Sequence, residues 1–186
     1  MEETSVKFTR RHSTRVETGY ATRVERHGRS IVTYIFVKEN AMNKFMELAI
    51  NEAKKGIRNK EGGPFGSVIV KDGKVVGRGH NKVVANNDPT AHGEMMSIRD
   101  ACNRLGTFDL TGCELYTTSE PCPMCKCAIM WANIKKVYYG CTVNDAEDIG
   151  FRDVVFATQS PESIEVDRAE CLNLFEEYKS LDHTNY

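Results

Sequence analysis

The sequence has neither a long apolar run nor a surplus of charge of one sign. Its longest apolar stretch, residues 31–37, includes Thr33 and Tyr34 and is far shorter than the roughly 20 residues that a membrane helix needs. With 25 Lys and Arg against 26 Asp and Glu, the net charge is −1, which does not suit a protein that binds nucleic-acid phosphates. We therefore expect neither a membrane nor a nucleic acid as a partner.

We do not expect a secretory signal either, because the first twenty residues are charged and contain no apolar centre. The cysteines number seven, which is odd, and Cys122 and Cys125 stand in a Cys-x-x-Cys pair. A metal-like pair together with free thiols is typical of a reducing compartment rather than of a disulfide-bonded secreted domain. The sequence therefore indicates a cytoplasmic protein.

Residues 1–41 differ in composition from the rest of the chain. They carry eight Lys and Arg against five Asp and Glu, a net charge of +3, and show no sustained periodicity. We expect a basic, disordered N-terminal extension. A transit peptide fits less well because Glu17 and Glu25 interrupt the acid-poor pattern, and in a third interpretation translation starts at Met42, so that the extension is not native. Residues 42–186 have the length and apolar content of one globular domain.

Hydrophobic periodicity predicts helices and strands from residue 42 onward. Apolar residues at helical spacing predict a helix over 45–57 that ends before Gly62-Gly63-Pro64. Residues 67–71 and 74–80 predict the strands of a β-hairpin, with Asp72-Gly73 as its two-residue turn. A helix is predicted next over 91–105, with Asp88 or Thr90 as its N-cap.

The C-terminal half predicts a strand, a helix and a second strand, over 114–118, from 121 or 122 to 133, and over 136–140. This order of elements forms a parallel crossover, so the sheet is predicted to be mixed. Weaker patterns predict a short helix over 144–149, a strand over 163–166 and a helix over 168–178. The predicted fold class is α/β, with three layers in the order α/β/α, a mixed sheet of about five strands and helices on both faces.

A histidine and two cysteines have the spacing of zinc ligands. His92 precedes Glu94 by two residues, and Cys122 and Cys125 lie about thirty residues downstream at a predicted helix start. One imidazole and two thiolates suit tetrahedral Zn²⁺ and leave its fourth position open for water, for which Glu94 is spaced to move protons. The alternatives are two buried thiols with a core histidine, or a structural zinc site. Cys127 is a poor fourth ligand because it is rotated about 200° from Cys125 on a helix.

Beyond this signature, residues 42–186 resemble the cytidine-deaminase superfamily, and within it the bacterial guanine deaminases and the related plant guanosine deaminases. The resemblance implies a cytidine-deaminase-like fold, Zn²⁺ held by His92, Cys122 and Cys125, and Glu94 as the catalytic acid and base. The segments that carry it are Gly62-Gly63-Pro64-Phe65-Gly66, Asn87-Asp88-Pro89-Thr90-Ala91-His92, Ser119-Glu120-Pro121-Cys122-Pro123-Met124-Cys125, Ala128-Ile129, Trp131-Ala132, and Gly150-Phe151 before Asp153.

The resemblance also implies residues that bind the purine. Asn81 matches an asparagine that hydrogen-bonds the base, and Phe65 an aromatic residue that packs on it. Asp153 matches an acid that accepts hydrogen bonds from the purine edge. Trp131 is expected near the pocket, with a buried helix position as the alternative. Gly93, whose backbone N–H faces the reacting group, stands where the family usually has alanine.

The end of the chain bears on assembly. In these guanine deaminases the C-terminal segment packs on a partner subunit, and a terminal tyrosine closes the neighbour's pocket. This chain ends in Tyr186, so the resemblance implies a homodimer with exchanged C-terminal segments. Arg152 departs from the family, because relatives often have a second acid at that position.

The expected function is the zinc-dependent hydrolysis of guanine, a small-molecule purine base, to xanthine and ammonia. Four alternatives stay open from the sequence: deamination of guanosine, of cytosine or an aminotriazine, of adenosine in tRNA, or no catalysis at all in a zinc-binding module.

Overall fold

The computed structural model describes the backbone of residues 4–12, 15–26, 29–37, 42–152, 162–166 and 168–181. Two units are distinguished along the chain, Met1–Asn43 and Lys44–Tyr186. The boundary falls close to the change in composition seen at residue 42.

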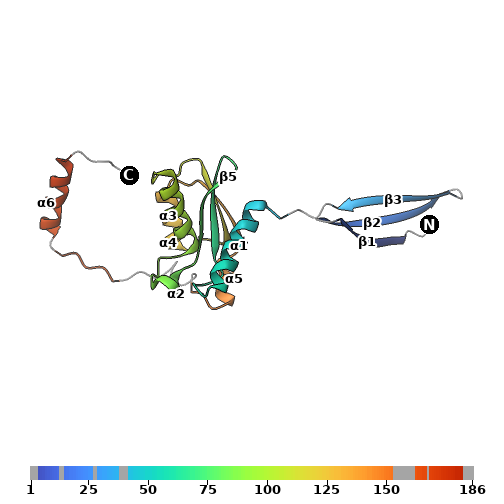
Figure 1. Cartoon of the computed structure of the whole chain (residues 1–186), viewed down its shortest axis with the longest axis horizontal. Coiled ribbons are helices and arrows are strands. Elements are labelled where there is room, and N and C mark those ends of the chain that lie inside the picture. The colour runs from blue at the N-terminus through green and yellow to red at the C-terminus, as the bar shows by residue number, and fades with distance from the viewer. Residues whose placement is uncertain are drawn as a thin grey trace. The chain divides into compact units, whose positions relative to one another are not determined.

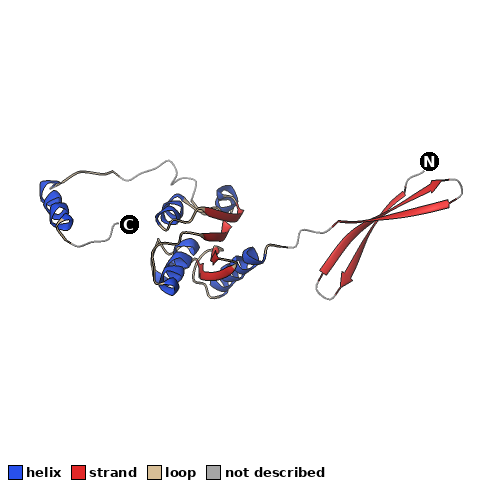
Figure 2. Ribbon diagram, turned by 90° about the horizontal axis from the view of Figure 1, so that it is seen from above, coloured by secondary structure: helices blue, strands red, loops and turns tan. Residues whose placement is uncertain are grey.

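The first unit is a three-stranded antiparallel sheet in the order β1-β2-β3 (Figure 2). The strands are β1 (Thr4–His12), β2 (Arg15–Arg26) and β3 (Arg29–Val37). These strands differ from the disordered extension that we expected. Residues 31–37 are all β-branched or aromatic, and such side chains fit a pleated strand. That the extension is not native stays a prediction.

The second unit contains a four-stranded mixed sheet in the order β5-β4-β6-β7. Strand β4 (Gly66–Lys71) pairs antiparallel with both β5 (Lys74–His80) and β6 (Cys113–Ser119). Strand β7 (Lys136–Cys141) pairs parallel with β6, which confirms the predicted crossover. The predicted strand over 163–166 is wrong: residues 162–166 have no regular structure, and Ile164 and Val166 remain exposed without a layer to cover them.

Helices cover both faces of this sheet, as Figure 1 shows, with α1 on one side and α3 and α4 on the other. The bounds are α1 (Lys44–Arg58), α2 (Val83–Asn86), α3 (Gly93–Leu105), α4 (Pro123–Trp131), α5 (Val143–Asp148) and α6 (Arg168–Lys179). Among the helices described, none combines the length and the apolar content required to cross a bilayer.

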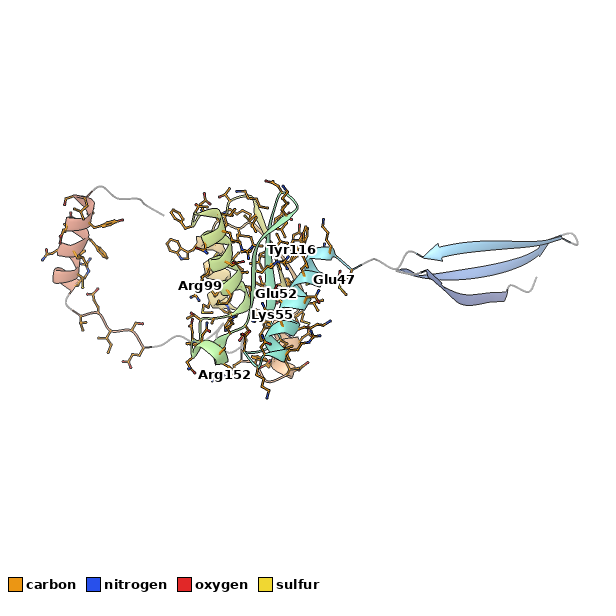
Figure 3. The ribbon with its side chains drawn as sticks, viewed as in Figure 1. Glu47, Glu52, Lys55, Arg99, Tyr116 and Arg152 are labelled. Carbon is orange, nitrogen blue, oxygen red and sulfur yellow. The ribbon has the colours of Figure 1, made fainter. Side chains whose placement is uncertain are left out.

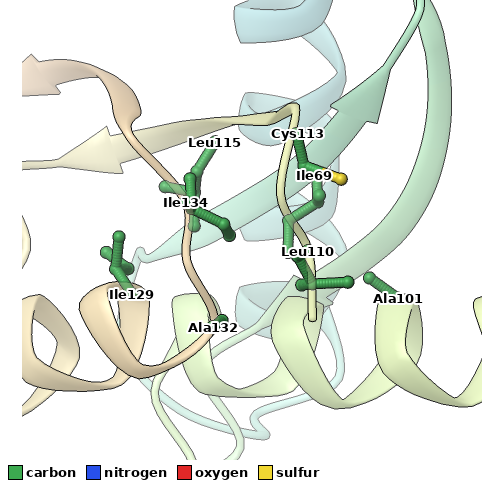
Figure 4. Close-up of a cluster of buried hydrophobic side chains, with 8 residues drawn as sticks. All are labelled: Ile69, Ala101, Leu110, Cys113, Leu115, Ile129, Ala132 and Ile134. Carbon is green, nitrogen blue, oxygen red and sulfur yellow. The ribbon is translucent and has the colours of Figure 1, made fainter. Parts of the chain in front are cut away.

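Two apolar clusters fill the spaces between the layers. The larger cluster joins α3 and α4 to the sheet through residues such as Ile69, Leu115 and Ile129 (Figure 4). The smaller cluster joins α1 to the other face through Val68 and Val70 with neighbouring aromatic residues. Because successive strand residues point to opposite faces, alternate positions of β4 and β6 serve the two clusters. The odd-numbered positions of β6 therefore face α3 and α4.

Helix α1 lies unusually close to the start of β4. A Cβ atom at Gly66 would stand 2.2 Å from the carbonyl oxygen of Ala49 and 2.4 Å from the backbone nitrogen of Ala53. Backbone atoms cannot swing aside as side chains do, so any larger residue at Gly66 must push the whole helix away. The first residue of β4 is thus specified by helix packing.

We predict that Gly66→Ala lowers the free energy of unfolding by about 1–3 kcal/mol, the usual cost of overpacking. Chemical denaturation of the purified variant measures this change. Gly106→Asn is the matched control, because Gly106 ends α3 with φ of 67° and has open space around it, and asparagine tolerates that conformation. Equal denaturation midpoints for Gly66→Ala and the wild-type chain would refute the packing argument.

Candidate metal centre

His92 and Cys122 occupy equivalent positions at the starts of two helices. His92 is the N-cap of α3 with φ −70° and ψ 160°, and Cys122 is the N-cap of α4 with φ −65° and ψ 168°. Neither side chain caps its helix, so the predicted capping of α3 by Asp88 or Thr90 is wrong. Asp88 instead accepts hydrogen bonds from the backbone N–H and hydroxyl of Thr90, at 2.8 and 2.7 Å.

The side chains of His92, Cys122 and Cys125 converge from these two helix starts. Their potential ligand atoms all lie within 4.8 Å of one another, and His92 Nδ1 is 3.6 Å from Cys122 Sγ. Tetrahedral Zn²⁺ with bonds of about 2.0–2.3 Å places its ligand atoms roughly 3.5–3.8 Å apart, so the cluster fits this ion. Cys127 is exposed and lies outside the cluster, which agrees with its predicted orientation.

The thiols of the cluster are polarised. A hydrogen bond with Cys125 lowers the pKa of Cys122 to about 4, and the His92 ring acts in the same direction. The same hydrogen bond raises the pKa of Cys125, because the two thiols share one proton. A thiolate is the metal-binding form of cysteine, and a bound Zn²⁺ displaces the remaining proton.

Glu94 lies beside the cluster and is buried, with 5% of its surface exposed. Its Oε1 accepts a hydrogen bond from the Thr117 hydroxyl at 3.2 Å, and its Oε2 lies 3.7 Å from Cys125 Sγ. Burial raises the pKa of Glu94, since removal from water disfavours the charged carboxylate. The backbone is held as well, because the Ser97 hydroxyl donates to the Glu94 carbonyl at 2.9 Å. A carboxyl group of raised pKa is suited to take up and release a proton.

A cavity of about 450 Å³ opens beside the cluster, and His92, Glu94 and Cys122 form part of its wall. Phe65 also lines the cavity and meets Phe151 edge to face, with ring centroids 4.6 Å apart. Arg152 lies on the same wall, at the end of the domain that contains α2 and α5 (Figure 3). The volume suits a small planar heterocycle.

Asn81 reaches the cavity with its amide already oriented. The side chain is 4% exposed, and its Oδ1 accepts from the backbone N–H of Val83 at 3.2 Å and of Gly63 at 3.4 Å. Its backbone N–H donates to the Phe65 carbonyl at 2.8 Å. Because the protein already engages Oδ1, the Nδ2 amide group is the donor that Asn81 offers to a ligand.

Residues 39–141, more than half of the chain, match the model of the cytidine and deoxycytidylate deaminase zinc-binding region. The chain belongs to this family of deaminases. The family binds zinc, in agreement with the His/Cys/Cys cluster.

Among individual deaminases, the guanine deaminase of Bacillus subtilis (strain 168) is 50% identical over 109 residues, which cover 59% of this chain and 70% of that protein. A tRNA-specific adenosine deaminase of Aquifex aeolicus (strain VF5) is 46% identical over 95 residues, covering 51% and 62%. The X-ray structure of guanine deaminase from Bacillus subtilis matches with a TM-score of 0.72 and 39% identity, covering 78% of this chain and 99% of that one. The predicted fold class is confirmed, with four strands in the domain's described sheet rather than about five.

Two of the predicted substrate residues, Trp131 and Gly93, are not among the residues that line the cavity. Trp131 is 67% exposed and lines a different hollow, with Cys127, Met130 and Asn133. Gly93 is buried between two lining residues, His92 and Glu94, and a Cβ atom there would stand 2.9 Å from the Phe65 carbonyl oxygen. Glycine at this position therefore permits α3 to approach the start of β4. Asp153 and Tyr186 lie outside the described residues.

The deaminase site also has supporting residues that the sequence did not reveal. The buried ring of His80 lies between two carboxylates, with Nδ1 3.5 Å from Glu52 and Nε2 hydrogen-bonded to Glu61. His80 directly precedes Asn81, and Glu61 lies two residues before Gly63, whose backbone N–H donates to Asn81. This network ties the cavity loop to α1. Thr117, in contrast, could have been found from strand alternation, because it shares the α3-facing side of β6 with Leu115.

We predict that Cys122→Ala abolishes stoichiometric zinc in the purified deaminase. The affinity should fall by more than the roughly 10–100-fold that loss of an outer hydrogen-bond partner costs. Metal content per chain, measured by atomic emission, tests this. Cys127→Ala is the control in the same helix and should retain zinc; loss of zinc from the control alone would contradict the assigned cluster.

Proposed function

We propose that this chain is a zinc-dependent guanine deaminase, which hydrolyses guanine to xanthine and ammonia. One observation carries the proposal: the His/Cys/Cys cluster and the buried Glu94 form the wall of a cavity that Phe65 and Asn81 also line. A metal site, a proton carrier and a surface for a planar base therefore meet in one place. The similarity to a guanine deaminase over most of that protein's length supports the choice of base.

His92, Cys122 and Cys125 would hold Zn²⁺, which would supply a water nucleophile at neutral pH. Glu94 transfers both protons of that water. Its carboxylate first takes one from the attacking water and delivers it to the ring nitrogen beside C2, and then takes the second from the new C2 hydroxyl and delivers it to the departing amine. The raised pKa of Glu94 suits a group that must both accept and donate. Thr117 and Ser97 keep the carboxyl group and its backbone in place.

Among the described residues, one stacking contact and one polar contact orient the base. Phe65, braced by Phe151, supplies an aromatic surface for the purine ring. Asn81 donates from Nδ2 to an acceptor of guanine, because its Oδ1 is engaged by two backbone N–H groups. Asp153, outside the described residues, remains a proposed acceptor for the purine N–H groups.

The main competing function is deamination of adenosine in tRNA, because a tRNA-specific adenosine deaminase is 46% identical over part of this chain. Residues 42–186 carry a net charge of −4, which argues against binding to RNA phosphates. Steady-state rates on guanine, guanosine, cytosine, an aminotriazine and a tRNA substrate separate the candidates. Turnover of any other substrate without turnover of guanine would reject the proposal.

Assembly and location are part of the same proposal. A homodimer would cover the apolar side chains that α4 and the loop after α3 expose, since Met130 is 64%, Trp131 67% and Phe108 52% exposed. Exchange of C-terminal segments ending in Tyr186, and residence in the cytoplasm, also stay proposals.

We predict that Glu94→Gln retains zinc and lowers kcat for guanine by at least about 10²–10⁴-fold, the range of a lost general acid or base. The loss of absorbance as guanine becomes xanthine, together with ammonia release, measures turnover. Glu114→Gln, at the far end of β6, is the control and should match the wild-type rate. Wild-type turnover in Glu94→Gln would remove this carboxylate from the mechanism.

Asn81→Asp separates binding from folding. The new carboxylate keeps an acceptor for the N–H groups of Gly63 and Val83 but loses the Nδ2 donor. We expect the Tm to stay near that of the wild-type protein while kcat/KM for guanine falls by about 5–30-fold, as for loss of about one to two kcal/mol of hydrogen bonding. A fall in Tm with unchanged kcat/KM would assign Asn81 to structure alone.

A further inference from the structure

Ser119 is the last residue of β6 and is buried, with 6% of its surface exposed. Across the described side chains, its Oγ is the one buried nitrogen or oxygen atom without a hydrogen-bond partner. Such a hydroxyl is unfavourable in a folded protein, because burial removes its water contacts without replacing them. The position therefore calls for a partner from outside the protein's own side chains and backbone.

The place of Ser119 in the sheet directs it toward the site. Leu115, Thr117 and Ser119 alternate along β6, so they share the face that α3 and α4 cover. Leu115 packs in the apolar cluster and Thr117 donates to Glu94. Ser119 follows at the carboxyl end of the strand, where it lines the 450 Å³ cavity together with Glu94 and Cys122.

Other polar groups on the cavity wall are already engaged. Both carboxylate oxygens of Glu94 have partners, in Thr117 and Cys125. The Asn81 Oδ1 accepts two backbone N–H groups, and the carboxylate of Glu120 pairs with Lys126 at 2.9 Å. Asn81 Nδ2 can donate to a base, but the amine-bearing end of guanine presents N–H donors that need an acceptor. The Ser119 hydroxyl is an acceptor that the protein has left without a partner.

We propose that Ser119 is a further substrate-binding residue, whose hydroxyl accepts a hydrogen bond from the N–H groups at the amine-bearing end of the bound purine. This inference rests on the proposed function and adds a polar contact to those proposed for Asn81 and Asp153. A serine rotates between three staggered positions with little cost, so the hydroxyl turns to the base when the base is present. The contact favours aminated bases over heterocycles without N–H donors at that end.

Ser119→Ala in the full-length, zinc-loaded protein is the decisive variant. We expect kcat/KM for guanine to fall about tenfold, as for loss of one neutral hydrogen bond, while the Tm without ligand is unchanged or higher. Ser119→Thr keeps the hydroxyl and should restore kcat/KM, because a second cavity of about 130 Å³, which Ser119 also lines, has room for the added methyl group. Wild-type kcat/KM in Ser119→Ala would overturn the proposal.

Ser67→Ala is the matched control for a structural serine. Ser67 is buried like Ser119, but its hydroxyl is hydrogen-bonded to Ser97 at 2.8 Å. Loss of that bond should lower the Tm of Ser67→Ala, whereas Ser119→Ala should not lose stability. A lower Tm with unchanged KM in Ser119→Ala would assign Ser119 a structural role and reject the binding role.

Binding without turnover separates this inference from the proposed function. The affinity for guanine is measured by calorimetry in Glu94→Gln and in Glu94→Gln with Ser119→Ala. About tenfold weaker binding in the double variant supports the Ser119 contact, and equal affinity rejects it. If Glu94→Gln does not bind guanine at all, the proposed substrate fails, and the same pair of variants is compared on whichever base the wild-type protein deaminates.

Discussion

Two helix N-termini meet at one edge of the sheet, and the arrangement of the site follows from that meeting. Each helix begins at a metal-ligand candidate, His92 or Cys122, whose extended backbone turns the side chain away from its own helix. The unpaired N–H groups of such ends favour anionic ligands. Strand β4 pairs antiparallel with both β5 and β6, so the carboxyl ends of β5 and β6 lie at the same end of the sheet. The starts of α3 and α4 follow these strand ends, where ligands of α/β proteins usually bind.

The cluster also explains why a glutamate can be buried so deeply. A carboxylate next to two thiols is unfavourable in an apolar interior, and the raised pKa of Glu94 reflects that cost. A divalent cation in the cluster compensates it, so metal binding and the stability of this part of the fold are coupled. The hydroxyl of Thr117 and the backbone contact of Ser97 keep the acid in place on the β6 and α3 sides.

Local sequence patterns predicted the parts of the site that depend on spacing along one element. Cys122 and Cys125 share a helical turn, and Glu94 follows His92 by two residues. The members of each pair could therefore be expected to lie close together from their spacing alone. The hairpin turn was equally local, because Asp72 and Gly73 adopt the positive φ values of 49° and 72° that its two residues favour. In each case a few neighbouring residues determine the geometry.

Features that depend on contacts between distant segments were not predictable in the same way. Trp131 follows the cysteines in sequence, yet it is exposed at the end of α4 and is not among the residues that line the cavity with Phe65. The two carboxylates around His80 come from α1 and from the loop after it, and no periodicity signals such a meeting. The strands of residues 4–37 were missed because a basic composition outweighed their β-branched residues.

The close approach of Gly93 to the Phe65 carbonyl has a consequence for attempts to redesign this enzyme. A Cβ atom at this position, between His92 and Glu94, would stand 2.9 Å from that oxygen. A larger side chain at position 93 must therefore displace either the start of α3, which carries Glu94, or the backbone that carries Phe65. Libraries that vary position 93 thus also vary the distance between the acid and the aromatic ring.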